Sequence, residues 1–449
     1  MKKLLFCCLI LMSHWAFAQT VFETILPRIN DDVQSGITTA ALNTNATSAL
    51  TQLQANGKFS DISNYSNAEN GVHLSRVRDM ARAYTRAGSA YKDSVRVYNA
   101  IVLALNTWYT LNPNHDNWWY DDINYPQSIG QILILMRYGL TPIGTTLENQ
   151  LISRMKIKTF KKGDGANTTD EALHYLYRAC LTQNAVTLDS AATFSFEGIS
   201  YGFTEGMNED DSFTAHGKQL YVNGYGGEFI KTSYNVATFL EGTTYALNST
   251  KKQMLNKLYL NTFIKAGRGS HRDFNTVGRG ISRGSGISHS RSTGVFSSYL
   301  GDVRTVNPAL TATLDSVASG THQLKPLHNR YFKGDYDLHI RSGYSFGLRT
   351  VSTRTVRAEK GNGENLLGKF LSDGATNIQR IGPEYQNIYP IWEWDKIPGT
   401  TSRDFAGDTG STITAADWGS VAGLTNYVGG VSDSLYSASA YDMDFNGVK

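Results

Sequence analysis

A glycine-rich stretch at residues 208–229, NEDDSFTAHGKQLYVNGYGGEF, combines one histidine with two tyrosines. His216, Tyr221 and Tyr225 have side chains of the types that take a proton from carbon and return one to oxygen. Glycines at positions 217, 224, 226 and 227 disfavour a helix and let the backbone approach a ligand closely. The alternative is a polar surface loop in which these rings only pack, and this stretch taken alone favours that alternative.

A second stretch, residues 265–291, separates its cations with glycines and contains Asp273 as its only acid. The cations are Lys265, Arg268, Arg272, Arg279, Arg283 and Arg291. The glycines exclude an amphipathic helix, so we expect a flexible cationic loop, which suits an acidic polymer. A basic loop that is merely solvated is the weaker alternative.

Two further stretches lie before the first. Trp118 and Trp119 precede a helix predicted to open at Pro126. Neighbours on a helix point in different directions, so one or both indoles should line a groove and stack on a sugar, with helix packing an equal alternative. Asn167 should lie just before a helix capped by Thr168 and Glu171, where the helix dipole favours an anion. A plain turn with its cap is the preferred alternative for that segment alone.

Two acidic segments follow residue 350. The first, AEKGNGENLLG, contains Glu359, Asn362, Glu364 and Asn365. The second, WEWDKIPGTTSRDF, supplies three hard oxygen donors suited to Ca²⁺, namely Glu393, Asp395 and Asp404. Carboxylates at this spacing are a weak signal without other support.

Length and composition favour two globular domains, because the chain has 449 residues with 41% hydrophobic and 18% charged residues. A net charge of +3 is too small to indicate nucleic-acid binding. Residues 1–18 read as a signal peptide, with Lys2 and Lys3 before an apolar run too short to span a membrane. We therefore expect an exported, periplasmic or secreted protein without membrane insertion. Only Cys180 remains after cleavage, so no intramolecular disulfide is expected.

Hydrophobic spacing predicts helices from about residue 22 to residue 325, arranged as stacked hairpins in an incomplete α/α toroid. They include helices at 126–139, 142–157, 169–182, 229–247 and 250–265. From residue 330 the sequence alternates polar and apolar residues, which predicts an antiparallel β-sandwich domain over 330–449. The chain stops inside a predicted strand, so we expect more β-structure in a longer parent protein.

Taken in order, these segments resemble polysaccharide lyase family 8, whose members include chondroitin AC, hyaluronate and xanthan lyases. The resemblance covers most of the chain after the leader. It is carried by NWW before a proline-led helix, GAN-TD-ALHY, a histidine followed after eight residues by a tyrosine, GRG-SR, GNGENL and WEWDKIPGTTSRD. The last motif, together with GPEYQNIYP, resembles the chondroitin AC members most.

The resemblance implies cleavage of a uronic-acid glycosaminoglycan, chondroitin sulfate or hyaluronan, by β-elimination. It implies that Asn167 and His216 contact the uronate carboxylate, and that Tyr225 removes the C5 proton and protonates the leaving oxygen. Arg279 would assist Tyr225. Glu359 would hold His216 and Arg283. Neutralising the carboxylate stabilises an enolate-like transition state.

The resemblance also implies sugar contacts by Trp118, Trp119, Arg283 and Asn362. Glu393, Asp395 and Asp404 would hold a structural Ca²⁺, and the chemistry itself would need no cofactor. We expect the nearby Arg279 to lower the pKa of Tyr225. Tyr221 is the rival for the role of base, and only the family spacing selects Tyr225.

Three alternatives stay open at this point. The first is a lyase for another acidic glycan, such as xanthan. The second is a non-catalytic glycan-binding protein, which would have no use for His216, Tyr225 and Asn167 together. The third is a glycoside hydrolase, which needs two flanking carboxylic acids, with candidates Asp210, Asp211 and Glu228. The expected partner is an acidic polysaccharide, bound by a monomer.

Overall fold

The computed structural model describes residues 21–65, 69–156, 163–284, 286–287, 304–319, 321–400, 427–433 and 436–442. The predicted leader, residues 1–18, lies outside this part of the chain. Internal contacts divide the chain into two units. Unit 1 comprises Met1–Phe160, Asp170–Ser195 and Val236–Ala246, and unit 2 comprises Lys161–Thr169, Phe196–Asn235 and Leu247–Lys449.

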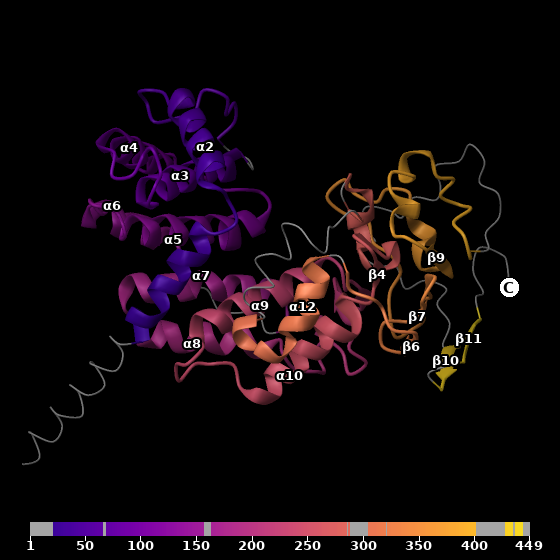
Figure 1. Cartoon of the computed structure of the whole chain (residues 1–449). Coiled ribbons are helices and arrows are strands. Elements are labelled where there is room, and N and C mark those ends of the chain that lie inside the picture. The colour runs from indigo at the N-terminus through magenta and orange to yellow at the C-terminus, as the bar shows by residue number, and fades with distance from the viewer. Residues whose placement is uncertain are drawn as a thin grey trace, which may run out of the picture. The chain divides into compact units, whose positions relative to one another are not determined.

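Unit 1 is built from helices. A helix over residues 21–34 is followed by α2 (Thr39–Gln52), α3 (Glu69–Thr85), α4 (Val95–Leu111), α5 (Tyr125–Met136) and α6 (Thr145–Arg154). Most of α7 (Ala166–Thr182) and of α8 (Ala185–Glu197) also belongs to this unit. Helix α3 packs against α2, α4 and α5, and α5 packs in turn against α6 (Figure 1). Unit 1 thus stacks its helices in layers, as predicted.

Helix α5 is the most deeply buried of these helices. A short π-helix, Tyr120–Asn124, leads into it, and Pro126 lies in its first turn as the sequence predicts. Its side chains from Ser128 to Met136 are buried except at Gln131. An apolar surface on every side suits a helix that neighbours cover all round.

The helical part of unit 2 begins with α9 (Tyr225–Leu240), whose last turn lies in unit 1, followed by α10 (Ser249–Lys257) and a π-helix, Leu258–Phe263. The expectation that the glycines disfavour a helix around Tyr225 was wrong, because α9 starts at that residue. Gly226 and Gly227 form its first turn, where an added Cβ would lie 3.1 Å from the side chains of Phe213 and Phe263 respectively. These glycines allow close packing rather than a loop.

Strands take over in the second half of unit 2, as predicted. Strands β6 (Leu327–Tyr331), β7 (Tyr336–Arg341), β8 (Tyr344–Arg349) and β9 (Ala375–Gln379) form an antiparallel sheet in that order. Strands β10 (Val428–Ser432) and β11 (Ser437–Tyr441) form a separate hairpin. Helix α12 (Thr311–Ala318) precedes the sheet.

Smaller elements of unit 2 carry several of the polar residues singled out above. Strands β1 (Gly206–Met207), β2 (Phe213–Ala215) and β3 (Gln219–Leu220) form a three-stranded sheet. Strands β4 (Gly267–Arg268) and β5 (His271–Arg272) form a hairpin, followed by the 3₁₀ turns Phe274–Thr276 and Gly278–Ser282. The expectation of a flexible loop was therefore wrong over the described part of residues 265–291. Arg291 lies outside the described residues.

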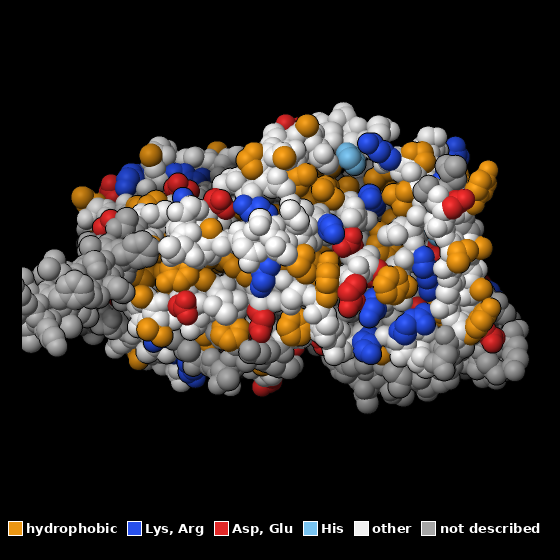
Figure 2. Space-filling view, turned by 90° about the horizontal axis from the view of Figure 1, so that it is seen from below, with side chains coloured by type: hydrophobic (Ala, Val, Ile, Leu, Met, Phe, Trp, Pro, Cys, Tyr) orange, Lys and Arg blue, Asp and Glu red, His pale blue; other side chains and the backbone are white. Residues whose placement is uncertain are grey.

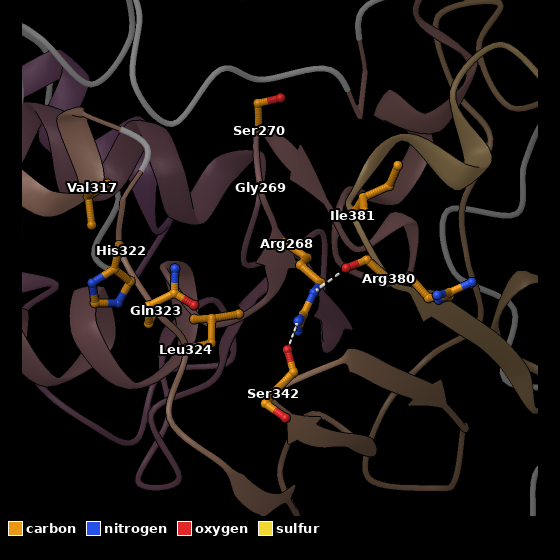
Figure 3. A pocket seen from close by; sticks show the side chains of 10 residues that line it. All are labelled: Arg268, Gly269, Ser270, Val317, His322, Gln323, Leu324, Ser342, Arg380 and Ile381. Atoms are coloured by element: carbon orange, nitrogen blue, oxygen red, sulfur yellow. Dashed lines mark hydrogen bonds between the residues drawn. The ribbon is translucent and has the colours of Figure 1, made fainter.

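Arg268 shows why this segment is held in place. Its Nε donates to the carbonyl oxygen of Arg380 at 2.6 Å, and Nη2 donates to the carbonyl oxygen of Ser342 (Figure 3). Its Nη1 donates to Ser345 Oγ at 3.2 Å. The guanidinium thus ties the β4–β5 hairpin to the ends of β8 and β9.

The helices in the described part of the chain lack the combination of length and hydropathy that a membrane-spanning segment needs.

Candidate active site

His216 lies in the tight turn between β2 and β3. Its φ is 52°, in the left-handed region, and Gly217 follows at φ 81°. Its Nδ1 lies 2.6 Å from Glu359 Oε2. A carboxylate oxygen can only accept, so the shared hydrogen belongs to Nδ1, and this fixes the ring's tautomer. Arg279 Nη1 lies 3.0 Å from the same Nδ1.

Glu359 is fully buried and is held from several sides. Arg279 Nη1 donates to its Oε1 at 2.6 Å, and the hydroxyl of Tyr221 donates to the same oxygen at 3.1 Å. The amide of Asn365 donates to its backbone carbonyl oxygen at 2.7 Å. A buried carboxylate that accepts from several donors, one of them a cation, is held in one position.

Arg279 is the hub of the cluster, although only 5% of it is exposed. Its Nη2 donates to the Tyr225 hydroxyl at 3.1 Å, and its Nε donates to Glu364 Oε2 at 3.0 Å. Burial lowers its pKa, but Tyr221, Tyr225 and Glu359 raise that pKa further, to a value above the ordinary one. Arg279 therefore stays a cation that touches both the imidazole's carboxylate and a tyrosine hydroxyl.

The two tyrosines differ in what their hydroxyls do. Tyr221 is 3% exposed, and its hydroxyl donates to Glu359 while accepting from the backbone N–H of Arg279 at 3.0 Å. Tyr225 is only partly buried, and the ring centroids of Tyr225 and His216 are 4.6 Å apart. In the described part of the chain the Tyr225 hydroxyl accepts from Arg279 and donates to no residue. Tyr221 is thus committed to structure, and Tyr225 keeps its own proton for a ligand.

The expected lowering of the Tyr225 pKa was wrong. Burial raises the pKa of Tyr225, and the opposing effects of Arg279 and Arg283 do not outweigh it. Desolvation disfavours the phenolate more than one hydrogen-bonded cation favours it, because that cation is already shared with Glu359 and Glu364. Tyr225 is accordingly a neutral phenol at pH 7 in the free protein.

The predicted contact between Glu359 and Arg283 was also wrong. Arg283 is held by Glu364, through Nε at 2.6 Å and Nη2 at 3.0 Å, and Glu359 holds Arg279 instead. Glu364 closes a four-residue turn that starts at Gly361 and exposes Asn362 at φ 54°. The sequence offered Glu364 only as part of the GNGENL motif, because no local pattern reveals a partner more than 80 residues away.

Asn167 lies in the first turn of α7, which begins at Ala166. The expectation that it precedes a helix capped by Thr168 was wrong by a few residues. Just before this turn, the backbones of Asp164 and Glu205 form an isolated parallel β-bridge. The side-chain carboxylate of Glu205 accepts a hydrogen bond from the backbone N–H of Gly217 at 2.9 Å. Through Glu205, the start of α7 is connected to the turn that carries His216.

Trp118 and Trp119 belong to unit 1. Trp118 is 46% exposed, whereas Trp119 is partly buried. The rings of Trp119 and Tyr120 meet edge to face, with their centroids 5.2 Å apart. Their different surroundings agree with the argument that neighbouring indoles cannot share one core.

The predicted calcium ligands do not form a complete site among the described residues. Glu393 pairs with Lys396 at 2.8 Å, Asp395 is partly buried, and Asp404 lies outside the described residues. No group of three His, Cys, Asp or Glu side chains in the described part of the chain could hold a metal ion. The two described acids supply only part of the six to eight oxygen ligands that Ca²⁺ takes.

Comparison with known proteins adds to this geometry. The family model described as "Polysaccharide lyase family 8, N terminal alpha-helical domain" matches residues 18–318. The chain belongs to polysaccharide lyase family 8. The model of the family's super-sandwich domain matches residues 326–449. The predicted fold class, a helical N-terminal region followed by an antiparallel sandwich domain, is thereby confirmed.

Individual relatives agree with the family. The chain is 38% identical to chondroitinase-AC of Pedobacter heparinus over 100% of its own length and 65% of that protein. It is 26% identical to the xanthan lyase of Bacillus sp. strain GL1, over 73% of the chain and 40% of that lyase. The chain therefore spans less than two thirds of these curated relatives.

Solved structures of chondroitin AC lyases share the fold of this chain. A chondroitinase AC lyase structure determined with oligosaccharides is 38% identical and superimposes with a TM-score of 0.89, over 95% of this chain and 64% of that one. The Streptomyces coelicolor A3 chondroitin AC lyase in complex with chondroitin sulphate, at 17% identity, shares the fold with a TM-score of 0.74, over 93% of this chain and 65% of that one.

Proposed function

We propose that this protein cleaves a uronic-acid-containing glycosaminoglycan, chondroitin sulfate or hyaluronan, by β-elimination, and leaves 4,5-unsaturated uronate ends. The observation that carries the proposal is the contact between Arg279 and the Tyr225 hydroxyl beside the His216–Glu359 pair. The 38% identity to a chondroitinase-AC supports the substrate class. A relative at 26% identity is a xanthan lyase, so another acidic glycan is the second candidate.

In the proposed reaction Tyr225 acts at the carbon and then at the oxygen. Its phenolate takes the C5 proton, the electron pair forms the C4–C5 double bond, and the C4–O4 bond breaks. Tyr225 then gives the proton to the leaving oxygen, so proton and charge balance over the cycle. Because the free site holds Tyr225 as a neutral phenol, the phenolate is the scarce form, and Arg279 stabilises it as it develops.

The other site residues are proposed to bind and orient. Asn167 and His216 would meet the uronate carboxylate, and Glu359 would keep the His216 ring in one tautomer and orientation. Substrate contacts are proposed for four side chains, Trp118, Trp119, Arg283 and Asn362. In Figure 2, Lys and Arg side chains gather over the strand-rich part of unit 2 with acids among them, and Arg283 is one of the exposed cations of this unit.

A glycoside hydrolase is less well supported, because the acids that kept it open are engaged elsewhere. Asp210 accepts from Ser212 Oγ at 2.6 Å and from the backbone N–H of Lys333 at 2.6 Å. Asp211 accepts from the Asn261 amide at 2.9 Å. Glu228 is exposed and lies 3.8 Å from Lys231. A pure glycan-binding protein would need no tyrosine hydroxyl on a buried arginine.

The test is product chemistry on a panel of chondroitin sulfates, dermatan sulfate, hyaluronan, xanthan and alginate. A lyase produces an unsaturated uronate with near-ultraviolet absorbance, and a hydrolase produces a reducing end without that absorbance. New reducing ends without absorbance, or binding without cleavage, would overturn the proposal.

We also propose export through the leader at residues 1–18 and action as a monomer. Domain boundaries at 22–325 and 330–449 and a structural Ca²⁺ at Glu393, Asp395 and Asp404 belong to the same proposal. No cofactor enters the chemistry.

A further inference from the structure

One carboxylate, that of Glu364, is shared by the two arginines of the candidate active site. Its Oε2 lies 3.0 Å from Arg279 Nε and 3.0 Å from Arg283 Nη2, and its Oε1 lies 2.6 Å from Arg283 Nε. The Arg279 side chain is 6% exposed and the Arg283 side chain is 58% exposed. Glu364 therefore joins a buried cation to a cation at the surface.

For Arg279 this contact is the third fixed point of a planar group. Glu359 accepts from Nη1, the Tyr225 hydroxyl accepts from Nη2 and Glu364 accepts from Nε, so each of the three guanidinium nitrogens contacts a different residue. Two contacts at the terminal nitrogens leave the guanidinium room to tilt. A third contact at Nε removes that freedom and sets the direction of the N–H that reaches Tyr225.

For Arg283 the contact is stronger still. Both hydrogen bonds described for its side chain go to Glu364, one to each carboxylate oxygen. Arg283 lines a cavity of about 350 Å³ together with Trp394 and Leu366. Glu364 therefore fixes the position of the Arg283 guanidinium at the cavity. Its negative charge also offsets the repulsion between Arg283 and Arg279.

The backbone of Glu364 stabilises the turn that precedes this residue. Its N–H donates to the carbonyl oxygen of Gly361 at 2.9 Å and closes the turn in which Asn362 and Gly363 have φ of 54° and 76°. Because the side chain of Glu364 is fixed to both arginines, the turn that exposes Asn362 is fixed to them as well.

We propose that Glu364 is a positioning residue that holds Arg279 and Arg283 as a pair and fixes the turn that presents Asn362. The inference rests on the proposed lyase function and adds to it a residue that does not touch the reacting atoms.

The charges around Tyr225 provide a readout that a purely structural role would not change. Burial raises the pKa of Tyr225, Arg279 and Arg283 lower it, and Glu359 raises it. The rings of His216 and Tyr221 also face it. Removing the charge of Glu364 leaves both cations less compensated, so the pKa of Tyr225 should fall. The pH at which kcat/KM levels off should then move to lower pH.

The experiment compares Glu364→Gln with Glu209→Gln, a control that neutralises an exposed acid paired with Lys333 at 3.4 Å. Chondroitin sulfate cleavage is followed by ultraviolet absorbance across pH, and melting temperature is measured alongside. We expect kcat of Glu364→Gln to fall by up to about 100-fold, as small misplacements in a reacting site cause. The pH profile should shift to lower pH in this variant alone. Glu364→Asp should lose kcat through its shorter reach while keeping the wild-type profile.

A second measurement separates this inference from the proposed function. The phenolate absorbance of Tyr225 is titrated without substrate, as the difference between each protein and its Tyr225→Phe counterpart. If the wild type cleaves no glycan, the proposed function fails, and a lower Tyr225 pKa in Glu364→Gln still supports the arrangement. An unmoved Tyr225 pKa, or a loss of kcat that only follows a loss of folded protein, would overturn the inference.

Discussion

The sharpest prediction separates the two tyrosines that share the site. Tyr225→Phe removes one hydroxyl and leaves the ring that packs on His216. It deletes the one hydrogen bond that the described residues give this hydroxyl, from the charged Arg279 Nη2 at 3.1 Å, which is worth about 1.5 kcal/mol at a partly buried position. If Tyr225 is the base, the loss of turnover should be about 10²- to 10⁴-fold. That loss corresponds to about 2.7–5.4 kcal/mol of transition-state stabilisation.

Tyr221→Phe should do the opposite. Its hydroxyl donates to the fully buried Glu359 and accepts from the backbone N–H of Arg279, so the substitution leaves two buried polar groups short of a partner. Each such loss costs about 1–3 kcal/mol, so stability should fall by about 2 kcal/mol or more. Turnover should stay within about tenfold of wild type, since positioned proton transfer accounts for the larger factors.

The assay measures kcat and KM by ultraviolet absorbance on chondroitin sulfate, and the melting temperature and urea midpoint of both variants. Our assignment requires lost turnover with near-wild-type melting for Tyr225→Phe, and lowered melting with retained turnover for Tyr221→Phe. KM should change little in Tyr225→Phe, because the hydroxyl acts on the proton rather than on binding. The reverse pattern would make Tyr221 the base and refute the argument from its two committed hydrogen bonds.

Three further outcomes are expected. Because burial raises the pKa of Tyr225, the phenolate fraction is small at pH 7 and grows with pH, so log(kcat/KM) should rise by about one per pH unit above neutrality; a flat profile would contradict a tyrosine base. The exposed Arg283 should make KM rise with salt, since the Debye length falls from about 10 Å at 0.1 M to about 3 Å at 1 M; an unchanged KM would leave this cation outside the substrate site. If Glu393, Asp395 and Asp404 hold Ca²⁺, chelation should lower the melting temperature by mass action, whereas unchanged melting and no calcium by elemental analysis would remove the metal.

The sequence predicted the order of elements well because that order depends on local periodicity. Residues 336–349 alternate polar and apolar side chains, and they form β7 and β8. The apolar run of α5 likewise shows a helix covered on every side. Helix starts were less predictable. The structure uses Gly226 and Gly227 for close contact with Phe213 and Phe263, which local propensity cannot anticipate.

The sequence could predict which residue types make up the site, but not which of those residues contact each other. His216 and Glu359 are 143 positions apart, and Arg279 and Glu359 are 80 apart. No periodicity encodes such pairs, so motif resemblance supplied the residues but paired Glu359 with the wrong arginine. The prediction that the Tyr225 pKa is lowered was wrong for a related reason. Its sign depends on burial set against charges that are themselves partly neutralised, and only coordinates give both.

The charge balance of the site bears on how the proposed elimination would proceed. Arg279 and Arg283 are already matched by Glu359 and Glu364, so an incoming uronate carboxylate finds no unpaired cation among these four residues. In the proposed reaction, hydrogen bonds from side chains such as Asn167 and His216 would then have to stabilise the carboxylate. Nη2 of Arg279 donates to the Tyr225 hydroxyl instead. In the proposed reaction that contact is stronger with the phenolate that removes the C5 proton than with the neutral phenol of the free site. An arginine placed in this way favours the reactive phenolate over the resting phenol, and so raises the fraction of sites that can take the proton.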